Sequence, residues 1–193
     1  MSYTELFYVE KSGDVVWHSE YHNSHRGAGL VWHTMSHIYL FKEADWRNLQ
    51  PVWDLWEDEA VPVEMRIVMA STFDNVMIRR ENLTNLVAAF RVYSAMVRDA
   101  GNIELQIPNL EKLADDENCL AVCWNQTSVN CDTWSVWIGE QQKYRPYNIF
   151  KDSRHWFLFD AFHIGERGLQ FKCDLDMRRW KKALKDSQAG LDP

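Results

Sequence analysis

Two segments at the start of the chain predict a β-hairpin. Residues 3–10 (YTELFYVE) and 14–22 (DVVWHSEYH) are rich in aromatic and β-branched residues, and the Ser, Gly and Asp where they meet suit a tight turn. Strands joined by so short a turn are antiparallel neighbours, because a parallel connection needs a crossover of a dozen residues or more. We therefore expect part of the sheet to be built from strands that are adjacent in sequence.

Apolar segments in the second half of the chain extend this pattern. Residues 120–138 (LAVCWNQTSVNCDTWSVWI) are typical of two strands around a polar turn, and residues 155–164 and 168–175 add two more apolar segments. These strands outnumber the crossover helices that a doubly wound parallel sheet requires. The sequence thus predicts an α+β fold with a mainly antiparallel sheet and several packed helices, in a single globular domain over residues 1–193.

Helical patterns mark five later segments, which are residues 46–56, 62–69, 86–98, 107–118 and 177–185. Pro51 places the regular part of the first near Gln50 and makes that helix short. Gly101 is expected to end the helix over residues 86–98. Residues 30–41 fit neither a clean helical stripe nor a clean alternation, so a helix and a buried strand both stay open there.

The composition indicates the cellular compartment and the kind of partner. The amino-terminal residues include acidic side chains where a secretory signal needs an apolar run, and no segment approaches the roughly 18 to 20 uncharged residues that span a bilayer. We expect a cytoplasmic protein that does not enter a membrane. The formal charge of -7 opposes general affinity for nucleic acid phosphates and favours a protein, a small molecule or a cation as partner. Ten tryptophans exceed what a core needs, which indicates exposed aromatic anchors.

The cysteines carry little pattern. The chain has four, and they are Cys119, Cys123, Cys131 and Cys173. They are too sparse for a disulfide framework and contain no CxxC pair, so reduced and mostly buried thiols are expected. A cysteine nucleophile with a distant histidine such as His155 or His163 stays open, because such partners meet in space and not in sequence.

The stretch from Trp17 to His25, WHSEYHNSH, is the strongest candidate for chemistry. In a strand, alternate side chains point to opposite faces of the sheet. This predicts that Val15, Trp17, Ser19 and Tyr21 face the core, and that the opposite face carries Val16, His18, Glu20 and His22. Two imidazoles and a carboxylate, His18, Glu20 and His22, form the donor set that suits zinc, manganese or iron. The same residues with His25 also suit acid-base catalysis without a metal, and a solvated strand face is the preferred interpretation.

Two weaker motifs follow. The loop SHRGAG places Arg26 beside Gly27 and Gly29, where backbone N–H groups can hold an anion, although the spacing matches no phosphate-binding fingerprint. Arg26 is the expected contact if an anionic group binds. The pair His33 and His37 lacks the glutamate of a zinc-protease motif and is expected to lie in the core or at an interface.

The remaining binding candidates are aromatic, acidic and basic. Trp53 and Trp56 precede the acidic loop EDEAVPVE, a combination that suits a macromolecular partner. The terminal segment DMRRWKKALKDS predicts an amphipathic basic helix, which would contact nucleic acid or an acidic partner through Arg178, Arg179, Lys181 and Lys182.

The functional expectation follows from these motifs. A binding or regulatory protein that acts on another macromolecule, most simply another protein, is placed first, with no cofactor. This class includes the inhibitors of host machinery that are common among phage and mobile-element genes. The alternative is a metal-dependent or acid-base hydrolase centred on residues 18–25, with a divalent ion such as zinc or manganese.

Overall fold

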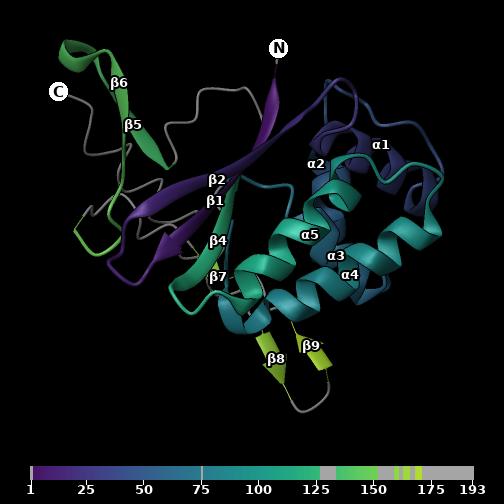
Figure 1. Cartoon of the computed structure of the whole chain (residues 1–193). Helices are drawn as coiled ribbons and strands as arrows, with labels where there is room; N and C mark the ends of the chain where they lie inside the picture. Colours follow the sequence, from purple (N-terminus) through teal and green to yellow (C-terminus); the bar gives the residue numbers. More distant parts are fainter. Residues whose placement is uncertain are drawn as a thin grey trace, which may run out of the picture.

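The computed structural model describes residues 2–74, 76–126, 134–151, 159–160, 163–165 and 168–170. Its centre is a five-stranded sheet in the order β2-β1-β4-β3-β7 (Figure 1). The strands are β1 (Tyr3–Glu10), β2 (Val15–His22), β4 (Cys119–Asn125), β3 (Val76–Arg79) and β7 (Phe159–Asp160). Every neighbouring pair is antiparallel except β3 with β7. The predicted α+β class with a mainly antiparallel sheet is confirmed.

The amino-terminal hairpin forms as predicted. β1 pairs with β2 over nearly its whole length, and the turn between them contains Gly13 at φ 88°, a conformation that other residues adopt only with strain. On its other side β1 pairs with β4. β1 therefore lies inside the sheet, whereas β2 is an edge strand among the described residues.

The strands within residues 120–138 exist, but they do not pair with each other as the sequence suggested. β4 lies between β1 and β3 in the main sheet, where five of its seven residues are buried, as is typical of a strand covered on both faces. β5 (Ser135–Ile138) instead pairs with β6 (Lys143–Pro146) in a separate two-stranded ribbon. A third small sheet joins β8 (His163–Gly165) and β9 (Gly168–Gln170).

The helices are α1 (Ala28–Tyr39), α2 (Gln50–Trp53), α3 (Val63–Ala70), α4 (Leu83–Met96) and α5 (Asn102–Asp115), with short 3-10 turns η1 (Asp54–Trp56), η2 (Arg80–Asn82) and η3 (Gly139–Gln141). Residues 30–41 are thus mostly helical, and the short helix near Gln50 is confirmed. The expected role of Gly101 is wrong: α4 ends at Met96, and Gly101 precedes α5 with φ 58°. The helix predicted over residues 107–118 begins earlier, at Asn102, and Pro108 lies inside it.

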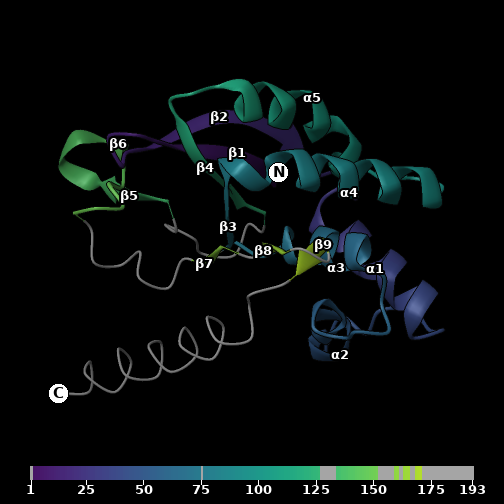
Figure 2. The same ribbon diagram turned by 90° about the horizontal axis from the view of Figure 1, so that it is seen from below.

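The helices cover one face of the sheet and form the main core with it (Figures 1 and 2). A second, smaller core lies on the other face, where side chains of β1, β2 and β4 meet Trp134. In both views the β5–β6 ribbon and the α1–α2 region lie at opposite ends of the molecule. No helix in the described part of the chain is long and apolar enough to cross a bilayer. The predicted basic helix over residues 177–185 lies outside the described residues.

Candidate functional site

A β-bulge divides the histidine-rich strand. Leu6 of β1 pairs with Ser19 while Phe7 pairs with Trp17, which leaves His18 as one extra residue in β2. The predicted strict alternation is therefore wrong beyond Trp17, because one inserted residue exchanges the faces of all residues that follow it. Ser19 turns toward Asn109 of α5, whereas Trp17 shares a face with Phe7.

The bulge separates the residues that were expected to share a metal. The His18 ring meets the Tyr8 ring edge to face at 6.1 Å, on the helix-covered side of the sheet. Glu20 is paired opposite Glu5 on the other side. His22 shares that second face, where its ring lies 5.2 Å from the ring of Tyr3.

The structure gives the hydrolase alternative no assembled centre within the described residues. Among these residues, no three His, Cys, Asp or Glu side chains lie close enough together to hold a metal ion. His22 Nδ1 instead hydrogen-bonds the hydroxyl of Ser24. His25 is exposed in a left-handed backbone conformation, φ 66°. His33 and His37 both lie on the exposed face of α1, so neither is a core histidine.

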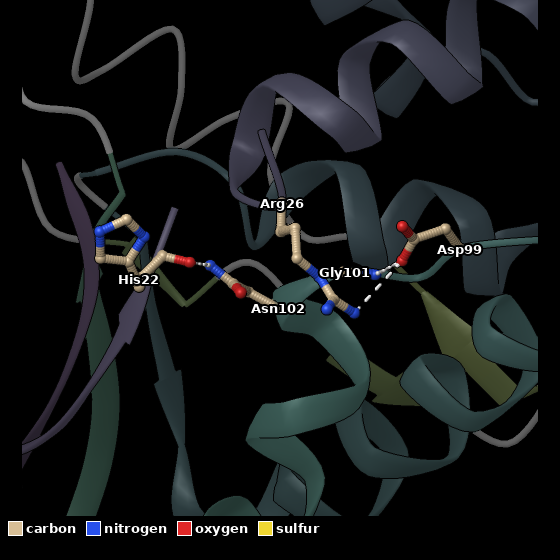
Figure 3. A network of polar contacts seen from close by, with 5 residues as sticks. All are labelled: His22, Arg26, Asp99, Gly101 and Asn102. Carbon is tan, nitrogen blue, oxygen red and sulfur yellow. Dashed lines mark hydrogen bonds and ion pairs between the residues drawn. The ribbon is translucent and has the colours of Figure 1, made fainter. Parts of the chain in front are cut away.

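The loop around Arg26 is a structural joint between two parts of the chain. Arg26 forms an ion pair with Asp99 at 3.4 Å, and the same carboxylate accepts the backbone N–H of Gly101 at 2.9 Å (Figure 3). Both members of the ion pair are about half exposed, and such pairs contribute about 0–1 kcal/mol. The Arg26 guanidinium thus meets an anion supplied by this chain.

The two glycines of that loop allow close packing. A Cβ added at Gly27 would lie 2.5 Å from Asn23 Oδ1, and one added at Gly29 would lie 3.0 Å from the Trp46 indole. Contacts this short exclude any larger residue unless the neighbour moves. The glycines that suggested an anion-binding loop are therefore explained by the side chains packed against them.

A buried network of amides lies beside this joint. Asn102 Nδ2 donates to the carbonyl oxygen of His22 at 3.4 Å and to Asn23 Oδ1 at 3.0 Å (Figure 3 shows the first bond). Thr4 Oγ1 also donates to Asn23 Oδ1, at 2.7 Å, and Asn23 Nδ2 reaches the carbonyl oxygen of Gln126 at 3.5 Å. The network ties together the ends of β1, β2 and β4 and the start of α5. The network gives hydrogen-bond partners to buried polar groups such as Thr4 Oγ1 and Asn23 Oδ1.

The two described cysteines are poor nucleophiles. Cys119 and Cys123 are free and buried in β4. Burial raises the pKa of the Cys119 thiol to about 11, with a smaller contribution from Asp116, and burial likewise raises the pKa of Cys123 well above its ordinary value. A thiol nucleophile needs the opposite shift, since only the thiolate reacts. Cys119 and Cys123 are therefore packing groups.

The other members of the possible cysteine-histidine pair fall largely outside the described part of the chain. Cys131, Cys173 and His155 lie outside the described residues. For His163 the structure describes only the backbone, as part of β8. The pairing of a cysteine with either histidine therefore stays a prediction.

A group of tryptophans lies where α1 and α2 meet. Trp32 is buried, and its Nε1 donates to Thr72 Oγ1 at 2.9 Å, which fixes the ring. The rings of Trp46 and Trp53 lie 6.5 Å and 5.6 Å from it. Trp46 is the outermost of the three and is 61% exposed. Sequence reasoning had selected Trp53 and Trp56, but Trp56 is only 3% exposed and packs in the main core.

Several carboxylates lie close to Trp46 and Trp53 in the sequence. Residues 42–59 contain six acidic and two basic side chains, a net of four negative charges. The acidic residues are all exposed, and they are Glu43, Asp45, Asp54, Glu57, Asp58 and Glu59. Within the described part of the chain, no ion pair joins any of them to a cation. We call Trp46, Trp53 and these six carboxylates the tryptophan-acidic surface.

The remaining residues that were predicted to contact a partner lie outside the described residues, and they are Arg178, Arg179, Lys181 and Lys182.

Comparison with known proteins gives no match to a family model, a curated protein or a solved structure. The surfaces of the described residues are therefore the basis for a function.

Trp46 could have been found from its place in the helical spacing 46, 49, 53 and 56. Nothing in that spacing distinguishes the exposed ring of Trp46 from the buried ring of Trp56.

Proposed function

We propose that this protein acts by binding another protein through the tryptophan-acidic surface. The observation that carries the proposal is the exposed Trp46 ring, which lies beside the buried Trp32, within a stretch of the chain whose six exposed carboxylates pair with no cation of the described residues. Tryptophan is among the residues that most often dominate binding energy at protein interfaces. The Trp46 ring already lies against Trp32. Binding through it is favourable because its side chain loses little conformational freedom.

The charge of the surface indicates the chemistry of the partner. Four excess negative charges within residues 42–59 attract a positively charged protein surface and accelerate its association. Lys or Arg side chains of the partner would meet the carboxylates, and an Arg could also lie over the Trp46 ring. We infer that the partner is a protein with a basic face.

The cytoplasmic location belongs to the same proposal. It is supported by the free thiols of Cys119 and Cys123, which are typical of proteins kept in a reducing compartment.

Affinity capture with matched variants tests this function. The full chain is used as bait in lysate of the native cell, in three forms: the unmodified protein, Trp46→Ala combined with Glu57→Lys, and a control with Trp17→Ala combined with Glu104→Lys. Trp17 is an exposed tryptophan of β2 and Glu104 an exposed acid of α5, so the control matches the change in residue type and charge. Quantitative mass spectrometry is expected to find a protein retained by the first and third forms and lost from the second.

Capture that is equal in all three forms would reject the tryptophan-acidic surface as the interface. Circular dichroism and thermal unfolding of each form verify that lost binding does not reflect lost folding. Binding of the purified partner should also weaken as salt is raised, because the attraction between exposed charges is screened.

A further inference from the structure

Helix α1 presents two histidines to solvent. His33 and His37 are the exposed residues of α1, and all the others are buried or partly buried. They lie four positions apart on one face of the helix, which places their Cβ atoms about 6 Å from each other. Two imidazoles at this spacing on one helix face can coordinate a single metal ion, as they do in helical zinc sites.

The two rings have no competing partner. In the described part of the chain, no hydrogen bond, ion pair or ring contact involves His33 or His37. The histidines of β2 differ, because His18 lies against another aromatic ring and His22 bonds the hydroxyl of Ser24. The ring nitrogens of His33 and His37 can therefore coordinate a ligand without breaking an interaction of the fold.

The electrostatic surroundings of this pair favour a cation. α1 contains no Lys or Arg whose charge would repel a metal ion, and His37 lies in its last turn, where the helix dipole is negative. Residues 42–59, which follow α1 closely in the chain, carry four excess negative charges. Part of this segment is α2, which lies beside α1 (Figure 1). These charges attract a cation toward this end of α1.

We propose that His33 and His37 bind one divalent transition-metal ion of the kind that prefers imidazole, such as Zn²⁺. Such ions accept nitrogen ligands, whereas Mg²⁺ and Ca²⁺ take oxygen. Within the described residues no third His, Cys, Asp or Glu joins the pair, so water or a donor of another molecule completes a four-coordinate shell. Thr34 stands where zinc proteases have the glutamate that acts as base, so the pair is a binding site without that catalytic group.

NMR of the full chain, purified without a histidine tag and treated with a chelator, tests the proposal. The imidazole nitrogens are observed with isotope-labelled histidine while Zn²⁺ is added. The signals of His33 and His37 are expected to shift together along the titration. Mg²⁺ at the same concentration should shift neither signal, because it takes oxygen ligands and keeps much of its water.

Two variants assign the ligands. His33→Gln and His37→Gln each remove one imidazole and keep a polar residue that suits a helix. In each variant the remaining ring should require at least about 10-fold more Zn²⁺ for the same shift, since loss of an outer-shell partner alone already weakens metal binding by about 10-fold or more. His25→Asn is the control, because His25 is exposed outside α1 and Asn tolerates its φ of 66°. It should leave the titration of His33 and His37 unchanged.

The proposal is overturned if neither ring shifts with Zn²⁺, or if the remaining ring of either variant titrates as it does in the unmodified chain. It is also overturned if Mg²⁺ shifts both rings equally, a result that would indicate general attraction of cations to the acidic residues. Circular dichroism verifies that the variants are folded. The probe is the metal ion alone, so the result does not depend on whether a protein binds the tryptophan-acidic surface.

Discussion

The backbone N–H of Asn102 donates to the carbonyl oxygen of Arg26 at 2.8 Å, which joins the loop after β2 to the first residue of α5. The approach depends on Gly101, whose φ is 58° and where an added Cβ would lie 2.5 Å from the Arg26 oxygen. Gly101→Ala should therefore lower the free energy of unfolding by about 1–3 kcal/mol. Urea denaturation measures this change.

Gly139→Ala is the control for that substitution. The nearest atom to an added Cβ at Gly139 is Trp137 Nε1 at 3.9 Å, an ordinary contact, and its backbone needs no positive φ. A loss of stability as large as that of Gly101→Ala would contradict the account of the joint.

Asn102→Ala tests the buried amide network. The change removes the donor that Asn23 Oδ1 and the His22 carbonyl oxygen share, and both acceptors stay buried or partly buried. The expected loss is about 1–3 kcal/mol of unfolding free energy. Asn48→Ala, at an exposed loop position, should change stability by less than about 0.5 kcal/mol. Similar losses of unfolding free energy in Asn102→Ala and Asn48→Ala would show that the buried network stabilises the fold no more than an exposed loop residue does.

Much of the fold could be predicted because local patterns agree with tertiary packing. The turn and the β-rich segments at the start specify the β1–β2 hairpin, and Pro51 lies in the first turn of α2, which begins at Gln50 as expected. The failures arise where distant contacts decide. A helix was expected over residues 107–118, yet Ile103, Gln106 and Leu110 are buried on one side of α5 and extend the helix through Pro108.

The candidate site was less predictable, for a physical reason. Inserting His18 into β2 exchanges the faces of Glu20 and His22, and no residue in the sequence marks a bulge. The exposure of the tryptophans could not be predicted either. Trp46 and Trp56 fit the same helical spacing, but Trp46 is exposed and Trp56 is buried.

Asp14 provides a test that depends on pH. Asn148 Nδ2 donates to Asp14 Oδ1 at 2.8 Å, and this bond, followed by that of Ser12, lowers the pKa of the Asp14 carboxyl. A carboxyl with a lowered folded pKa stabilises the fold above its unfolded pKa, and this contribution is lost as pH falls through the folded pKa. In Asn148→Ala the pKa of Asp14 should rise toward its ordinary value, and by more than in Ser12→Ala. Carboxyl NMR titration measures it, and a pKa that is the same in all three proteins would contradict the assignment.

The buried thiols predict slow alkylation. With the pKa of Cys119 at about 11 against an ordinary value of 9.0, its thiolate fraction at pH 8 falls about 100-fold on folding. Iodoacetamide should therefore label Cys119 and Cys123 at least that much more slowly in the native protein than in urea, as followed by peptide mass spectrometry. Equal rates in the two states would show that β4 is open to solvent.

The central claim is that Trp46 and the exposed carboxylates of residues 42–59 form an interface with a basic protein. Isothermal titration calorimetry of the captured partner with the unmodified chain, Trp46→Ala and Trp17→Ala tests it most directly. The account predicts a Kd at least 10-fold weaker for Trp46→Ala, or about 1.4 kcal/mol, and a Kd within about 2-fold of the unmodified value for Trp17→Ala. Equal affinity of Trp46→Ala and the unmodified chain would contradict it.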